Sequence, residues 1–479
     1  MSTGAWPGDV VVLAHGVATR QALPVPFELA RLGAAGALLL SFVVLVAAWR
    51  SPRFEGPDRR SGRPLPDAVQ RLADAPWVRV VLASVGLLAA AATLLAAALG
   101  PASAVANPAP TWLYVWLWVG LVPASLLLGP VWRWLNPLRT LAVVLARLSG
   151  DPDERSVRPL PARLGYRPAA AALAAFAWLE LVYPERTEPQ VVLVFLVLYG
   201  LVQLGAAMRW GSAWFAHGDG FEVWSTLLGH LAPVGRQGDD PDGRLVLRNP
   251  LAGLASIRPE PGLLAVIAVV LGSTVYDGLS GTTWWNELLV GLSEPGAVAL
   301  GTAGLAATVG AVALAWVLAC AVSHALAGRE APARVEVAAG GGGARLEPAG
   351  PAPWAPATAL AVALAHSLVP IAAGYTIAHY ASLLLWQGQA GWILASDPLG
   401  RGWDLFGTAG WAIQFDVAPP RTIALVQVGS IVLGHLLGVV AAHDRAVALF
   451  PPELARRSQY PLLAVMVAFT VIGIGLLLR

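Results

Sequence analysis

The chain has 479 residues, of which 57% are hydrophobic and only 13% are charged, and its mean hydropathy is +0.64. This composition excludes an ordinary soluble domain and is typical of a protein that crosses a lipid bilayer several times. The net charge of +2, without a basic run interleaved with aromatic residues, argues against binding to nucleic acid. The single cysteine, Cys320, excludes an intramolecular disulfide.

About ten apolar segments approach the roughly 20 residues that a helix needs to cross the hydrocarbon core. In chain order they cover 28–49, 78–100, 111–129, 168–184, 189–208, 261–280, 296–325, 356–386, 420–442 and 460–478. The segment 168–184 is short and 296–325 is long. No alternating ten-residue barrel pattern is present, so the sequence predicts an all-α, polytopic transmembrane helical bundle.

Arginine sets the expected orientation, because positive charge is retained on the cytoplasmic side. With ten spans and an outer N-terminus, 25 of the 31 basic residues, all of them arginine, fall in or beside the cytoplasmic loops. The six others are Arg20, Arg31, Arg186, Arg401, Arg421 and Arg479. We therefore expect a multi-pass protein of the cell membrane with both termini outside.

The spans and loops divide the chain into four parts. An extracytoplasmic segment, 1–27, contains "VVVLA" (10–14), which is too short for a typical signal-peptide core. A first transmembrane bundle, 28–337, carries cytoplasmic loops at 50–77, 130–167 and 209–260. A Gly/Pro-rich cytoplasmic linker, 338–356, leads to a C-terminal transmembrane segment, 357–479, with an outer loop at 387–419.

Two of the cytoplasmic loops contain patterns of local structure. The stretch 131–148 alternates apolar and arginine positions at helical spacing, which predicts a helix along the membrane surface. The stretch 217–254 predicts a short helix followed by an extended "GRLVLR". The histidines and aspartates of "HGDG" (217–220) and "AHDRA" (442–446) are expected to be helix caps and solvated interface residues.

The stretch "AHSLVPIAAGYTIAHY" (365–380) places two histidines within one span. His366 and His379 are 13 residues apart, about 20 Å along a helix, so they cannot bind the same ion. His366 is expected at the depth of His435, which Gly434 and Gly438 flank in a GxxxG pair. The two histidines are a candidate cofactor-binding pair for a metal or haem. The alternative is that each hydrogen-bonds a neighbouring helix and binds nothing.

A second group is predicted near the outer face. Its members are Glu180, Asp277, His379, Tyr380, Asp397, Arg401 and Asp404. A divalent metal held by carboxylate and imidazole can acidify a bound water. We expect His379 and Asp277 to act as metal ligands or base, with Asp397 and Asp404 as supporting catalytic residues. The alternative is that all are ordinary interfacial polar residues.

Motifs for several activities are absent from the sequence. It contains no P-loop, no GxSxG, no HExxH and no CxxCH. A solute or ion transporter is a further alternative, since five spans per half would invert the second half and "GSTVYDGLSG" (272–281) interrupts the sixth span with polar residues.

Five stretches carry a resemblance to a known family. They are "AHGVATRQALPVPFELA", "HGDGFEVWSTLLG", "LAHSLVPIAAGYTIAHY", "SDPLGRGWDLFGT" and "GHLLGVVAAHDRA". Together they resemble the polytopic actinobacterial membrane proteins named after fenitrothion hydrolase, over essentially the whole chain. The resemblance implies hydrolysis of an apolar organophosphate triester that partitions into the bilayer, with an activated water displacing a nitrophenolate from phosphorus. It assigns no catalytic residue.

Overall fold

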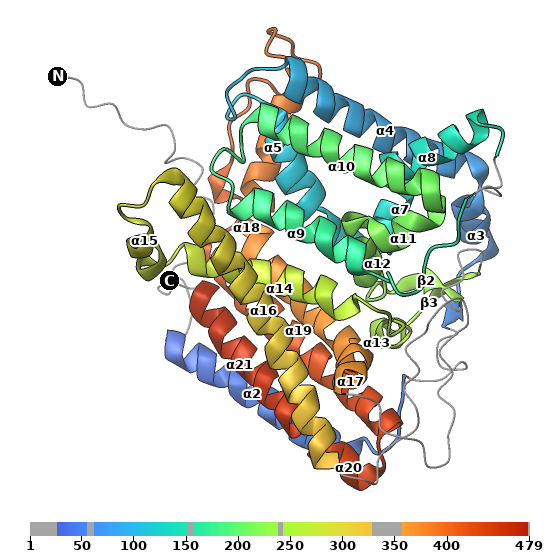
Figure 1. Cartoon of the computed structure of the whole chain (residues 1–479), viewed down its shortest axis with the longest axis vertical. Coiled ribbons are helices and arrows are strands. Elements are labelled where there is room, and N and C mark those ends of the chain that lie inside the picture. Colours follow the sequence, from blue (N-terminus) through green and yellow to red (C-terminus); the bar gives the residue numbers. More distant parts are fainter. Residues whose placement is uncertain (1–25, 55–61, 152–156, 238–242, 328–356, 478–479) are drawn as a thin grey trace.

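The structure is a computed structural model that describes residues 26–54, 62–151, 157–237, 243–327 and 357–477, and it is an all-α bundle (Figure 1). Within these ranges, nine helical segments are long and apolar enough to cross a membrane. They are α2 (Phe27–Ala48), α4 (Pro76–Leu99), α5–η3–α6 (Pro108–Thr111, Trp112–Val119, Leu121–Leu128), α10 (Pro189–Trp210), α14 (Leu263–Ser280), α16 (Glu294–Ala327), α17–η7–α18 (Ala357–Leu364, Ala365–Leu368, Val369–Ala395), α19 (Pro420–Leu449) and α20–α21 (Pro452–Arg457, Tyr460–Leu477). The predicted fold class is confirmed. The expected N-terminal segment and the linker 338–356 lie almost entirely outside the described residues.

Shorter elements connect these helices. They are α3 (Asp67–Asp74), α7 (Val131–Leu135), α8 (Pro137–Leu148), α9 (Arg167–Leu181), η4 (Ser212–Trp214), α11 (Phe215–Gly218), α12 (Gly220–Gly229), α13 (Pro250–Ala255), α15 (Thr283–Leu289) and η8 (Phe415–Val417). Strands β1 (Arg63–Pro64), β2 (Val234–Arg236) and β3 (Leu245–Leu247) form a small antiparallel sheet in the order β1-β3-β2. The predicted extended segment "GRLVLR" therefore includes β3.

The expected span 168–184 is a helix, but a short one. α9 has 15 residues, about 22 Å of helix against a hydrocarbon core of roughly 30 Å. At one end of α9, the amide of Tyr166 donates to the carbonyl of Pro261 at 2.7 Å, just before α14 begins. At the other end, Trp178 Nε1 donates to Thr302 Oγ1 on α16 at 2.9 Å. α9 thus begins beside the start of α14 and packs along it, and its other end contacts α16.

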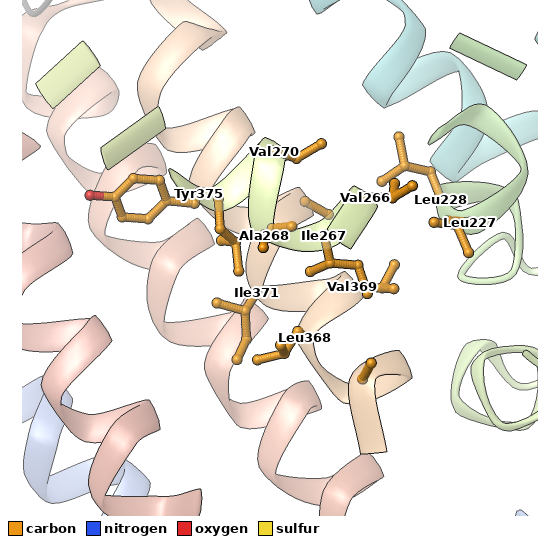
Figure 2. Packing of buried hydrophobic residues seen from close by; sticks show 14 of the residues in the cluster. Leu227, Leu228, Val266, Ile267, Ala268, Val270, Leu368, Val369, Ile371 and Tyr375 are labelled. Atoms are coloured by element: carbon orange, nitrogen blue, oxygen red, sulfur yellow. The ribbon is translucent and has the colours of Figure 1, made fainter. Parts of the chain in front are cut away.

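The core lies around α14, whose residues face other helices on most sides. Figure 2 shows side chains of α14 packed between Leu227 and Leu228 of α12 and side chains of η7 and α18. The labelled residues of α14 are Val266, Ile267, Ala268 and Val270, those of η7 and α18 are Leu368, Val369, Ile371 and Tyr375, and all of them are buried. A Cβ added to Gly272 would lie 2.4 Å from Val309 Cα on α16. Burial of this apolar surface holds α14 in the middle of the bundle.

α18 and α19 are antiparallel and their backbones approach closely. A Cβ on Gly434 would lie 2.5 Å from the Pro370 carbonyl oxygen, and one on Gly438 would lie 2.8 Å from that of Ser367. On the facing helix, a Cβ on Gly374 would lie 2.3 Å from the carbonyl oxygen of Ser430. The GxxxG pair expected to admit a second helix backbone does so.

Three features of the helices differ from the sequence-based expectation. α14 continues unbroken through "GSTVYDGLS", so the polar residues of the sixth span do not interrupt it. The surface helix 131–148 is divided at Asn136 into α7 and α8. The outer loop is shorter than 387–419, because α18 is helical to Ala395.

The extra length of α18 has a physical cause in the neighbouring π-helix η3. Trp112 Nε1 donates to the Gly391 carbonyl at 3.1 Å and Trp116 Nε1 donates to the Gly388 carbonyl at 3.0 Å. The two indoles stack at 6.0 Å on one side of η3. They stabilise helical geometry in a stretch whose glycines and glutamines predict a loop.

Candidate functional site

Asp277 of α14 and His379 of α18 are in direct contact between two helices in the membrane region. His379 Nε2 lies 2.8 Å from Asp277 Oδ2, and the Tyr380 hydroxyl donates to the same oxygen at 2.9 Å. The side chains of His379 and Asp277 are 10% and 13% exposed. The two residues singled out from sequence as ligands or base are thus brought into contact, and Tyr380 completes the Asp277–His379–Tyr380 cluster.

Glu180 lies beside this cluster because α9 packs along α14. The carboxylates of Glu180 and Asp277 interact electrostatically, and Arg186 is close enough to act on Glu180. The rings of His379 and Tyr380 are 4.8 Å apart in an edge-to-face arrangement. The Asp277 carboxylate and the His379 imidazole, in contact at 2.8 Å, can share a proton, since each changes charge on binding one.

Asp397 and Asp404 have another role in the structure. Asp397 accepts hydrogen bonds from the amides of Arg401 and Gly402 at 2.8 and 2.7 Å, and Asp404 accepts one from the amide of Ala409 at 3.0 Å. Both carboxylates therefore cap turns of their own loop. His379 is 16 residues before the end of α18, about 24 Å of helix, so the loop is not joined to the cluster.

The donor set around His379 does not fit a metal centre. Among the described residues, no group of three or more His, Cys, Asp or Glu side chains is arranged to hold a metal ion. A catalytic zinc site uses three protein ligands and an open position. Here the ring nitrogen Nε2 of His379 is directed at Asp277 itself.

His366 and His435 are both buried but do not face each other. His366 Nδ1 lies 3.1 Å from the Ala363 carbonyl, and the ring also hydrogen-bonds the backbone of Ala441 on α19. Ala441 is six residues, about 9 Å, beyond His435. His435 Nδ1 lies 2.8 Å from the Ile431 carbonyl of its own helix. The contacts of His366 match the alternative in which a histidine ties two helices together.

A buried polar cluster on the side of the predicted cytoplasmic loops was not anticipated as a unit. Asn136 Nδ2 donates to Asp219 Oδ2 at 2.9 Å and to Glu222 Oε2 at 3.0 Å, and Arg139 Nε donates to Glu222 Oε2 at 3.0 Å. The Tyr199 hydroxyl donates to Asp219 Oδ1 at 3.0 Å. Asp219 caps α12 as expected, but it is buried.

The buried position of Asp219 raises the pKa of its carboxyl group. Burial raises its pKa to about 6, and the charge of Glu222 adds to the effect. The Asp219–Glu222 spacing with Asp219 as N-cap is a local signal for a helix start. The partners Asn136 and Tyr199 come from distant segments, and no local signal identifies them.

The second motif expected on the cytoplasmic side, "AHDRA", is also buried instead of solvated. Asp444 accepts hydrogen bonds from Trp49 Nε1 at 3.0 Å and from the amides of Arg53 and Phe54 at 2.5 and 3.0 Å. His443 Nε2 lies 3.0 Å from the Trp49 carbonyl. These hydrogen bonds connect the end of α19 to the segment after α2.

These features define the class: a helical, multi-pass membrane protein with an aspartate–histidine–tyrosine cluster between two of its long apolar helices. In comparisons with known proteins, no family model, no curated protein and no solved structure matches the chain.

Proposed function

We propose that the protein is a proton-coupled membrane transporter in which the Asp277–His379–Tyr380 cluster binds and releases the coupling proton. The observation that carries this proposal is the 2.8 Å contact between His379 Nε2 and Asp277 Oδ2, located on two long apolar helices. Ionisable side chains in a membrane span are expensive, and those that occur mark ion and proton pathways. Histidine is the side chain that changes charge near neutral pH.

The limited exposure of the cluster favours proton exchange over a reaction with a bulky substrate. The His379 and Asp277 side chains are only 10% and 13% exposed, which admits water and protons more readily than an aryl phosphate triester. The second carboxylate, Glu180, gives the cluster more than one place for a proton. A proton could therefore move within the cluster without crossing lipid.

Orientation belongs to the same proposal. We propose the plasma membrane as the location, with both termini outside, on the 25-to-6 division of arginines and with the short helix α9 counted as a tenth crossing beside the nine long ones. Contacts among the loops support this assignment, because loops expected on the cytoplasmic side touch one another. Arg236 pairs with Asp74 at 2.6 Å, and Arg445 donates to the Ala255 carbonyl at 2.8 Å.

The transporter proposal is tested in proteoliposomes that contain a pH-sensitive dye. A panel of inorganic ions, amino acids and organic acids is added outside, and a solute that is coupled to protons changes the internal pH. Asp277→Asn and His379→Ala should abolish that change. Asp404→Asn is the matched control, since its carboxylate only caps the outer loop. Wild-type rates in both cluster variants would contradict the proposal.

Hydrolysis is the second candidate, because a carboxylate that orients an imidazole is also the arrangement of general-base catalysis. The resemblance to the fenitrothion hydrolase family points to an aryl phosphorothioate as substrate. Purified protein should then release nitrophenolate, measured by absorbance, and His379→Ala should not. The assay is run with and without added divalent cations. Equal release by wild type and variant in both conditions would refute a hydrolytic role for the cluster.

A further inference from the structure

Three buried side chains near the outer half of α18 and α19 have polar atoms without a protein partner in the described part of the chain. They are the hydroxyl of Ser382, the indole N–H of Trp386 and both amide atoms of Gln427. The residues are 2%, 4% and 1% exposed. Buried polar groups in proteins are nearly always hydrogen-bonded to protein or to ordered water, because an unpaired one costs free energy.

The helix register brings Ser382 and Gln427 to the same place. A Cβ on Gly438 would lie 3.0 Å from Ile371 Cδ1, which fixes one contact between the antiparallel helices. Ser382 follows Ile371 by 11 residues, and Gln427 precedes Gly438 by 11. Eleven residues are about three turns, so both side chains return to the facing sides of their helices.

Beyond this level, α18 contacts the segment that precedes α19. The Trp386 ring lies 6.2 Å from that of Phe415, shortly before α19 begins. One turn further out, Gln389 Nε2 donates to the Gln414 carbonyl at 3.1 Å and Gln389 Oε1 accepts from the Gln414 amide at 2.9 Å. The segment that leads into α19 therefore lies against α18 as far as the partly exposed Gln389.

The polar residues of α18 form one stripe that leads to the Asp277–His379–Tyr380 cluster. His379, Ser382, Trp386 and Gln389 are spaced by three, four and three residues, which places them on one side of the helix. Gln427 faces the same stripe from α19. The stripe thus extends from the partly exposed Gln389 to the contact between His379 and Asp277.

We propose that Ser382, Trp386 and Gln427 line an internal file of water molecules, which carries protons between the partly exposed Gln389 and the Asp277–His379–Tyr380 cluster. Water fits these groups because it can donate to the Gln427 carbonyl oxygen and accept from its amide and from the Trp386 indole. The delivery of protons rests on the proposed function, whereas the binding of water does not.

Radiolytic hydroxyl-radical footprinting of the full-length protein in detergent tests the binding of water, because radicals form from water next to the labelled side chain. Trp386 should be oxidised several-fold faster than Trp316. Trp316 is the matched control, since it is fully buried and its Nε1 donates to the Ala361 carbonyl at 3.0 Å. Equal oxidation of the two tryptophans in the wild type would overturn the proposal, independently of any variant.

Substitution gives a second readout. In Ser382→Ala/Gln427→Leu, the oxidation of Trp386 should fall to the rate of Trp316 while the thermal unfolding temperature stays the same or rises. Undiminished oxidation of Trp386 in the folded double variant would overturn the assignment of these residues. If the double variant does not fold, each single variant is measured in the same way.

Proton delivery is tested by infrared spectroscopy after a pH jump, with the carboxyl band of Asp277 identified by its loss in Asp277→Asn. Protonation of Asp277 should be several-fold slower in Ser382→Ala/Gln427→Leu than in wild type, and an unchanged rate would overturn delivery through this file. The two proposals fail separately. Transport that survives Asp277→Asn refutes the proposed function, whereas the oxidation of Trp386 alone decides whether water is bound.

Discussion

The close approach of α18 and α19 predicts a specific cost for adding one methyl group. In Gly434→Ala the new Cβ would lie 2.5 Å from the Pro370 carbonyl oxygen and 3.3 Å from Ile371 Cα. Ordinary contacts begin at about 3.4 Å, so the helices must separate by about 0.9 Å. Both neighbours are backbone atoms, which cannot rotate away. Overpacking of this kind costs about 1–3 kcal/mol.

Gly429→Ala is the matched control on the same helix. Gly429 is exposed and has nothing within 4 Å of its added Cβ. Both substitutions gain the same helix propensity, about 0.8–1 kcal/mol. The difference between them therefore isolates the contact, and Gly434→Ala should be less stable than Gly429→Ala by about 1–3 kcal/mol.

The assay is reversible unfolding in mixed detergent micelles, followed by tryptophan fluorescence. Gly429→Ala should unfold at a higher denaturant concentration than wild type, and Gly434→Ala at a lower one than Gly429→Ala. Equal free energies of unfolding for the two variants would show that α18 and α19 do not touch at Gly434, and the register argued for Ser382 and Gln427 would lose its basis.

Three further predictions concern buried groups elsewhere. The pKa of Asp219 is raised from 3.8 to about 6, so its contribution to stability is full below pH 3.8 and is lost as the pH rises through 6. In denaturant titrations, the free energy of unfolding of the wild type relative to Asp219→Asn should therefore rise by up to about 3 kcal/mol between pH 7 and pH 4. A difference that does not change with pH would contradict this. Asp444→Ala leaves the indole N–H of Trp49 and the amides of residues 53 and 54 without their acceptor, so the free energy of unfolding should fall by at least about 3 kcal/mol. A fall below about 1 kcal/mol would refute a stabilising role for these hydrogen bonds. Cys320 is fully buried, so a maleimide should label it only after denaturation in SDS, and labelling of the native protein would place it at an accessible surface.

Patterns that depend on a single helix could be predicted from the sequence. Hydropathy locates the long helices, and the GxxxG spacing of Gly434 and Gly438 predicts the close helix contact. The meeting of His379 with Asp277 could be anticipated because both lie near the same predicted face. These inferences need only the length of an apolar segment, the spacing of residues along a helix and their expected depth in the membrane, all of which can be read from one segment.

Patterns that depend on a distant partner could not be predicted. Stretch 387–395 is helical because two indoles of η3 bind its carbonyls, and nothing within the stretch encodes those donors. Asn136 and Asp219 are 83 residues apart and meet only in the folded bundle. His366 does not contact His435, because the glycine contacts fix the register of α18 on α19. In that register His366 hydrogen-bonds the backbone of Ala441 instead.

The glycine contacts between α18 and α19 also bear on movement. Backbones packed this tightly resist sliding, so the two helices should travel together as one rigid body whenever the bundle changes shape. Asp277 belongs to α14, outside that body, while His379 and Tyr380 belong to it. The contact between Asp277 and His379 therefore joins α14 to the α18–α19 pair, and in the proposed transporter the gain or loss of one proton there would change how strongly the three helices are held together.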